Sequence, residues 1–251
     1  MSERRPILAA NWKMHKTTGE AIAFVDAFLP LVRDAEVDVV LAPPFTALHA
    51  VGKALGGSRV ALAAQNASAE PKGAFTGEIS TQMLRDVGCS YAIVGHSERR
   101  ALYGETSELV ARKALALLEA GMRPIVCVGE TIDEREAGRV EDVVGGQLDG
   151  SLAGIPSDRA ADVVVAYEPV WAIGTGKTAT PEIAQDVHAF IRARLRKHFG
   201  GGGDAVRIQY GGSVKPDNVA ELMAKPDIDG GLVGGASLEP DSFARIVHFG
   251  R

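Results

Sequence analysis

The segment Val163-Val164-Val165-Ala166-Tyr167 is hydrophobic at every position, and Glu168 follows it directly. A strand with one solvated face would alternate polar and apolar residues. This segment therefore predicts a strand buried on both faces, as in parallel sheets. Together with seven similar runs it makes a set of eight, at 7–10, 37–42, 60–64, 91–94, 125–128, 163–167, 206–210 and 231–233. Their mean spacing is about 32 residues, the size of one strand-and-helix unit.

Helical signals fill the intervals between these runs. Thr17 and Glu20 have the spacing of a capping box and predict a helix that Pro30 should kink or shorten. Apolar residues at i, i+4, i+7 and i+8 from Val110 predict a second helix, which Gly121 is placed to close.

Prolines mark further helix starts. Thr180 followed by Pro181 predicts a helix with proline in its first position, and Pro216 and Pro240 can each start one more. Regular alternation of strands and helices predicts a parallel α/β fold. Eight units in 251 residues fit a single (β/α)8 TIM barrel domain spanning residues 1–251, and a doubly wound open sheet is the alternative.

Composition excludes several classes of protein. The net charge of −5 argues against a broad nucleic-acid surface, although it leaves room for a local cationic pocket. No apolar run approaches the ~18 residues of a membrane span, and no signal peptide is apparent. Cys89 and Cys127 each lie in an apolar stretch, so we expect buried free thiols and a reducing, cytoplasmic location.

The active site of such a barrel forms where the strands end. The polar and glycine residues at those points are Asn11, Lys13, His96, Glu168, Ser213, Gly234 and Gly235. Taken singly, the histidine could be a core residue, the lysine a solvated one, and the glycines turn residues with positive φ. Taken together, a carboxylate, an imidazole, a cation and glycine-rich turns before helices predict a phosphate site with proton-transfer groups.

The run 166–180 adds a feature typical of a lid. Pro169 keeps Glu168 out of the helical region, Trp171 is a bulky anchor, and Gly174 and Gly176 form the tip. A carboxylate on a rigid strand beside a segment built to move predicts a catalytic base under a lid. The same run contains no P-loop, because Trp171 occupies the position of the first glycine. No spacing of metal-ligating residues predicts a metal site.

The chain resembles the triosephosphate isomerase family over nearly its whole length. The segments that carry the resemblance are 10–14, 64–66, 73–78 (Gly-Ala-Phe-Thr-Gly-Glu), 95–100 (Gly-His-Ser-Glu-Arg-Arg), 127–130, 166–180, 210–214 and 231–237.

The resemblance implies a reaction and the residues that perform it. Dihydroxyacetone phosphate and D-glyceraldehyde 3-phosphate would interconvert through a cis-enediolate, in glycolysis and gluconeogenesis. Glu168 would be the base and His96, as a neutral imidazole, would move protons between the oxygens. Lys13 would stabilise the oxyanion, and Asn11 would orient the substrate. The backbone N–H groups of Gly174, Ser213, Gly234 and Gly235 would hold the phosphate.

The resemblance also implies closure, assembly and cofactor use. Loop 169–179 would close to keep water from the enediolate. Loop 65–79 would dock into a second subunit near its Lys13 and His96, giving a homodimer. Neither a metal nor a cofactor is needed. Two other functions remain open: a different phosphate-binding barrel enzyme, such as an aldolase or lyase, and a catalytically silent scaffold.

Overall fold

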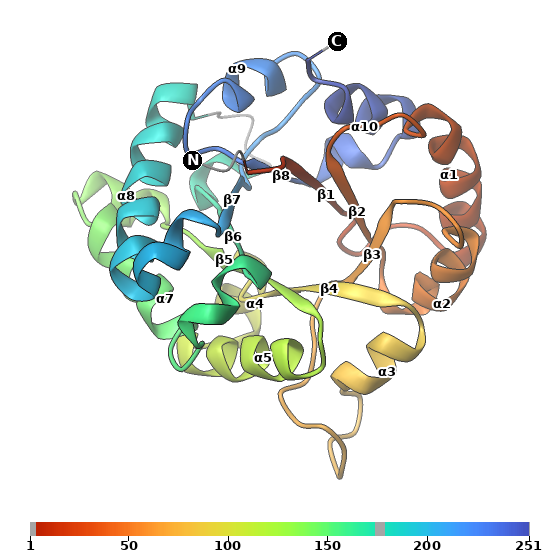
Figure 1. Cartoon of the computed structure of the whole chain (residues 1–251), viewed down its shortest axis with the longest axis horizontal. Coiled ribbons are helices and arrows are strands. Elements are labelled where there is room, and N and C mark those ends of the chain that lie inside the picture. The colour runs from red at the N-terminus through yellow and green to blue at the C-terminus, as the bar shows by residue number, and fades with distance from the viewer. Residues whose placement is uncertain (1–3, 174–178, 251) are drawn as a thin grey trace.

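The computed structural model describes residues 4–173 and 179–250 and contains a closed barrel of eight parallel strands. Figure 1 looks along the barrel, with the strands in the centre and the helices around them. The strands are β1 (Ile7–Asn11), β2 (Asp38–Ala42), β3 (Ala61–Ala64), β4 (Cys89–Val94), β5 (Arg123–Val128), β6 (Val164–Tyr167), β7 (Arg207–Tyr210) and β8 (Gly230–Val233). Each pairs in parallel with the next, and β8 pairs with β1. The predicted barrel is confirmed, and the open sheet is excluded.

Helices follow the strands around the outside. In the described part of the chain they are α1 (Thr18–Leu31), α2 (Phe45–Ala54), α3 (Thr81–Asp86), α4 (Ser97–Tyr103), α5 (Ser107–Glu119), α6 (Ile132–Glu136), α7 (Val140–Ser151), α8 (Pro181–Phe199), α9 (Val219–Met223) and α10 (Pro240–Val247). Short 3-10 turns lie at η1 (Ser157–Asp162), η2 (Val170–Ala172), η3 (Gly200–Asp204) and η4 (Gly235–Ser237).

Both faces of the strands are buried, as the apolar runs predicted. In β1, Ile7 and Ala9 belong to a cluster made of strand residues, which fills the barrel. Leu8 and Ala10 alternate with them and pack in the larger cluster between strands and helices. The barrel is therefore a packed core, and it fixes the position of any residue at a strand end.

Most helix boundaries agree with the sequence signals. The Thr17 N–H donates to Glu20 Oε2 (2.7 Å) at the start of α1, and this helix ends one residue after Pro30. Gly121 has φ +71°, and its N–H and that of Met122 donate to Leu118 and Leu117, which closes α5. Pro181 and Pro240 occupy first-turn positions in α8 and α10.

The prediction that Pro216 starts a helix is wrong. The side chain of Asn218 accepts from the Lys215 N–H (2.8 Å) and donates to the Ser213 carbonyl (2.9 Å). These bonds hold residues 215–218 in a turn, and α9 begins only at Val219. A local side-chain bond thus displaces the helix start.

His188 is a completely buried titratable group behind β6 and β7. Its ring packs on Tyr167 and Tyr210 (centroids 5.7 and 6.3 Å apart), and Nδ1 lies 3.0 Å from the Asp227 carbonyl. Burial lowers the pKa of His188 from 6.5 to about 4.

This histidine should make the fold sensitive to acid. Between pH 6.5 and 4, His188 is protonated in the unfolded chain but stays neutral in the folded chain. The free energy of unfolding is therefore highest above pH 6.5 and falls as the pH falls. From pH 7 to pH 5 the loss should be about 2 kcal/mol. We expect His188→Gln to reduce by that amount the pH dependence of the free energy of unfolding, measured with urea at both pH values. Equal pH dependence in variant and wild type would contradict this.

Candidate active site

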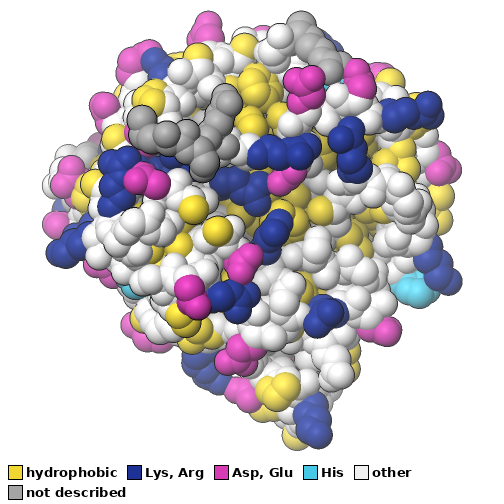
Figure 2. Space-filling view, in the orientation of Figure 1, with side chains coloured by type: hydrophobic (Ala, Val, Ile, Leu, Met, Phe, Trp, Pro, Cys, Tyr) yellow, Lys and Arg dark blue, Asp and Glu magenta, His cyan; other side chains and the backbone are white. Residues whose placement is uncertain are grey.

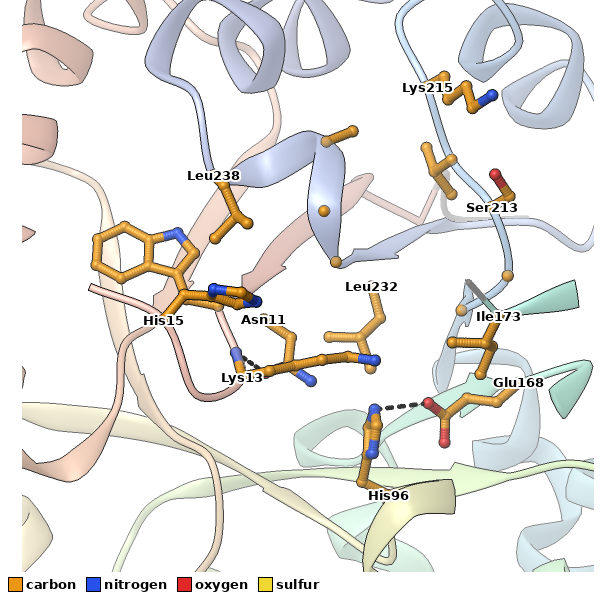
Figure 3. A pocket seen from close by; sticks show the side chains of 17 residues that line it. Asn11, Lys13, His15, His96, Glu168, Ile173, Ser213, Lys215, Leu232 and Leu238 are labelled. Carbon is orange, nitrogen blue, oxygen red and sulfur yellow. Dashed lines mark hydrogen bonds and ion pairs between the residues drawn. The ribbon is translucent and has the colours of Figure 1, made fainter. Parts of the chain in front are cut away.

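The residues predicted from the strand ends surround one cavity of about 290 Å³. Asn11 ends β1 and Lys13 lies two residues beyond it, while Glu168 directly follows β6. His96 comes from β4, Ser213 from β7, and Gly234 and Gly235 from β8. In Figure 3, His96 and Glu168 lie side by side in the lower part of the view, with Lys13 to their left and Ser213 above Glu168. Gly174, also predicted as a binding residue, is outside the described residues.

Glu168 is held rigidly by main-chain and side-chain contacts. Its side chain is buried, and its N–H donates to the Val128 carbonyl (2.8 Å). Oε2 accepts from the Ser97 N–H (2.9 Å), and Oε1 lies 2.9 Å from His96 Nε2. Burial alone would raise the pKa of Glu168, but His96, the Ser97 amide and Lys13 outweigh burial and lower it. The carboxylate is therefore ionised and can accept a proton.

His96 has a defined tautomer. It caps α4, and its Nδ1 accepts from the Glu98 N–H (3.3 Å). Nδ1 therefore carries no proton, and the Nε2–H of the neutral ring donates to Glu168 (2.9 Å). Burial opposes protonation of the ring, but the Glu168 carboxylate outweighs it and raises the pKa of His96. That cause is present only while Glu168 faces the imidazole.

Lys13 has a backbone conformation that could not be predicted from the sequence. Its φ is +50°, in the left-handed region that a non-glycine residue enters at a cost of about 1 kcal/mol or more. Its N–H donates to Asn11 Oδ1 (3.0 Å), and its carbonyl accepts from Gln65 Nε2 (2.9 Å). Its ammonium pairs with Glu98 (2.6 Å). The backbone is thus constrained to direct a cation into the cavity.

The ends of β7 and β8 present backbone donors to the cavity. Among the described residues, the N–H groups of Ser213, Gly234 and Gly235 donate to no protein acceptor. Three unpaired N–H groups at a cavity wall suit an oxyanion. Figure 2 also shows Lys and Arg side chains around the middle of one end of the barrel, despite the net negative charge.

Two of the glycines at these strand ends, Gly211 and Gly212, are needed for space. None of Gly211, Gly212, Gly234 and Gly235 has a positive φ, so the alternative interpretation as left-handed turn glycines is wrong. A Cβ on Gly212 would lie 2.2 Å from the Tyr210 hydroxyl, and one on Gly211 would lie 2.9 Å from Glu168 Cγ. The end of β7 can pack this closely against Glu168 and Tyr210 only because Gly211 and Gly212 have no side chain.

Comparison with known proteins decides the family. The family model described as triosephosphate isomerase matches residues 6–250. The chain belongs to the triosephosphate isomerase family. It is 58% identical over 246 residues to the triosephosphate isomerase of Moorella thermoacetica, covering 98% of this chain and 99% of the relative. It is also 58% identical over 248 residues to that of Herpetosiphon aurantiacus, with 98% and 99% covered.

Sequence reasoning about this triosephosphate isomerase family member missed the role of Glu98. The motif 95–100 contains Glu98, but nothing local shows its contacts. The structure brings it to Lys13, 85 positions away in sequence, and its Oε2 lies 3.5 Å from His96 Nδ1. Glu98 therefore fixes the ammonium and contacts the imidazole from the side opposite Glu168.

Glu130 was also missed. It is fully buried, and its Oε1 accepts from Tyr167 Oη (3.1 Å), Trp171 Nε1 (2.8 Å) and Arg135 Nη1 (3.1 Å). Trp171 was predicted as an anchor, and this contact ties it to the end of β5. The rest of the predicted lid, 174–178, is outside the described residues.

No group of three or more His, Cys, Asp or Glu side chains able to hold a metal ion occurs in residues 4–173 and 179–250. The polar side chains that line the cavity carry amide, imidazole, ammonium and hydroxyl groups and a single carboxylate, that of Glu168. This set suits proton transfer on an anionic substrate.

Proposed function

We propose that Glu168, His96 and Lys13 catalyse the isomerisation of triose phosphates in this chain. As a member of the triosephosphate isomerase family it is an isomerase that interconverts dihydroxyacetone phosphate and D-glyceraldehyde 3-phosphate. The observation that carries the assignment of roles is the His96–Glu168 pair, 2.9 Å apart, in the same cavity as the unpaired N–H groups. A base, an acid and an anion site thus face one small space.

The proton transfers follow from the protonation states. Glu168 takes the proton from the carbon next to the carbonyl, and the C–H electron pair forms the carbon–carbon double bond of the enediolate. His96 donates from Nε2 to the carbonyl oxygen and then recovers a proton from the neighbouring hydroxyl. Glu168 returns its proton to the other carbon. Lys13 supplies a fixed positive charge to the developing oxyanion, and Asn11 orients the substrate.

The substrate phosphate is assigned to the β7–β8 side of the cavity. The N–H groups of Ser213, Gly234 and Gly235 support this, because they are unpaired in the described part of the chain. Gly174 is proposed as a fourth donor on the resemblance alone. We propose that closure of loop 169–179 protects the enediolate from water.

Other functions are less well supported. A Schiff-base aldolase needs a nucleophilic amine, whereas the Lys13 ammonium is paired with Glu98 at 2.6 Å. A silent scaffold would have no reason to keep Lys13 in a strained backbone conformation.

The test of the activity is the initial rate with D-glyceraldehyde 3-phosphate, read by coupled reduction of the dihydroxyacetone phosphate formed. We expect fast turnover with nothing added beyond the substrate and the components of the coupling reaction. Negligible turnover by the folded wild type would favour the silent scaffold, and cleavage products would favour an aldolase.

We also propose a homodimer formed through loop 65–79, which projects from the barrel after β3 (Figure 1). The loop is closed at its base by the Ser68 N–H bond to the Ile79 carbonyl (2.9 Å), and it exposes Phe75 near its tip. Met14 is 95% exposed and Tyr103 70%, close in sequence to the active-site residues Lys13 and His96. Large apolar side chains with this much exposure are candidates for burial at a protein interface.

Disrupting the loop should therefore separate the subunits. We expect Phe75→Asp to elute as a monomer in size-exclusion chromatography with light scattering, because a charge would be buried at the interface. Activity should fall at least tenfold as the support for Lys13 is lost. The matched control is Leu31→Asp, which places the same charge on an apolar side chain that is 38% exposed at the end of α1, near the opposite end of the barrel. A fully active wild-type monomer at assay concentration would refute the dimer.

A cytoplasmic location and the absence of a nucleic-acid partner are proposed on composition and the two buried free thiols. Among the described residues, no helix has both the length and the apolar character needed to span a membrane.

A further inference from the structure

A second cavity, of about 470 Å³, lies at the opposite end of the barrel, where strands begin. Asp38 and Arg123 are the first residues of β2 and β5, and Tyr91 lies near the start of β4. Arg59 and Arg159 contribute from the segments before β3 and β6. None of these residues belongs to the cavity that holds Glu168.

Positive charge exceeds negative charge in this second cavity. Three arginines, Arg59, Arg123 and Arg159, face two aspartates, Asp38 and Asp162. Asp38 is already paired with Arg207 (2.6 Å) and Arg5 (3.0 Å).

Asp162 lies between two of these arginines. It pairs with Arg159 (2.8 Å) and, at a longer distance, with Arg123 (3.7 Å). The carboxylates therefore leave an unmatched cationic charge in a concave site.

Contacts with the protein hold the guanidinium groups in place. Tyr91 is buried, and its hydroxyl oxygen accepts from Arg123 Nη1 (3.1 Å) and Arg207 Nη2 (3.3 Å). Arg159 Nη2 donates to the Leu118 carbonyl (3.2 Å) and Arg59 Nη2 to the Arg33 carbonyl (3.0 Å). Oriented guanidinium groups lose less entropy when they bind a ligand.

Each of the three lining arginines keeps donors to spare. Among the described residues, no protein acceptor contacts Arg123 Nη2, Arg159 Nη1 or Arg59 Nη1. Guanidinium groups prefer ligands with several oxygens, such as phosphate and carboxylate. An acceptor with two or more negative charges would use these donors and neutralise the excess charge.

We propose that this cavity binds a small multivalent oxyanion of the class of phosphate and phosphorylated metabolites. The site is independent of the proposed catalytic roles, since its residues lie at the N-terminal ends of the strands. Because its charges are partly exposed, binding should weaken as ionic strength rises.

The test is a titration of the deuterated, ¹⁵N-labelled protein with inorganic phosphate at constant ionic strength, chloride being replaced. Two-dimensional amide spectra separate the sites. Ser90, Tyr91 and Met122 report on the second cavity, and Ser213, Gly234 and Gly235 report on the catalytic one. We expect saturable shifts in both groups. In the double variant Arg123→Gln/Arg159→Gln, the affinity for phosphate reported by Ser90, Tyr91 and Met122 should be at least tenfold weaker. The shifts of Ser213, Gly234 and Gly235 should be the same as in the wild type.

Unchanged shifts of Ser213, Gly234 and Gly235 also show that the double variant is folded. Arg194→Gln is the matched control, because Arg194 is a partly exposed α8 arginine paired with Asp149 (2.6 Å) away from both cavities. It should leave both groups of shifts unchanged. The proposal is overturned if Ser90, Tyr91 and Met122 do not shift in the wild type. It is equally overturned if they respond alike in the wild type and the double variant.

Discussion

Glu168→Gln is expected to lower kcat about a thousandfold, with KM changed by no more than a few-fold. Glutamine has nearly the same shape as glutamate, and its amide oxygen can still accept from the Ser97 N–H. It has no basic site for the substrate proton, and a positioned general base contributes about 10²- to 10⁴-fold in rate. The measurement is steady-state kinetics in both directions.

The matched control is Glu182→Gln. Glu182 lies in the first turn of α8, pairs with Lys225 (2.7 Å) and does not line the cavity. This variant should retain wild-type kcat. A Glu168→Gln enzyme within tenfold of wild type would contradict the assignment of the base.

Gly129→Ala should lower kcat about a hundredfold by moving the same glutamate. A Cβ on Gly129 would lie 1.7 Å from the Glu168 carbonyl oxygen and 3.2 Å from its Cα. Gly129 cannot easily retreat, because Gln147 binds both its N–H (2.8 Å) and its carbonyl (3.0 Å). The Glu168 backbone must shift, and a misplacement of about 1 Å at a reacting group costs roughly a hundredfold in rate.

A lower kcat with an unchanged Ki for inorganic phosphate distinguishes displacement of Glu168 from general disruption of the fold. The phosphate donors follow β7 and β8, whereas Gly129 follows β5 and Glu168 follows β6, so inorganic phosphate should inhibit the variant with a Ki within about threefold of wild type. Gly146→Ala is the control, since a Cβ at that α7 position has no heavy atom within 4 Å. Wild-type kcat in Gly129→Ala would show that Glu168 tolerates displacement.

The sequence predicted the barrel well because its signal is local. Each apolar run, such as 163–167, reflects burial on both faces of one strand. The register of the barrel then brings all eight strand ends to one mouth. Predicting Asn11, Lys13, His96 and Glu168 as neighbours therefore required no knowledge of distances. Pro216 misled the prediction because the Asn218 side chain holds the residues after Ser213 in a turn.

The partners of the site residues could not be predicted in this way. The Lys13–Glu98 pair and the Trp171–Glu130 bond join segments that only barrel closure brings together. The positive φ of Lys13 depends on hydrogen bonds to Asn11 and Gln65, and a lysine in the sequence does not predict it. Likewise, Gly211 and Gly212 look like turn residues, and their packing role is visible only once Tyr210 and Glu168 are placed.

The central claim is that Glu168 carries a proton between two adjacent carbons of the substrate. Conversion of D-glyceraldehyde 3-phosphate by the wild type in D₂O, followed by NMR of the product, tests it most directly. A proton held on a carboxyl group exchanges with solvent, so the account predicts dihydroxyacetone phosphate with deuterium at C1 in a substantial fraction of molecules. Rapid turnover with no deuterium at C1 in any product would indicate direct transfer of hydrogen between the carbons and would contradict the account.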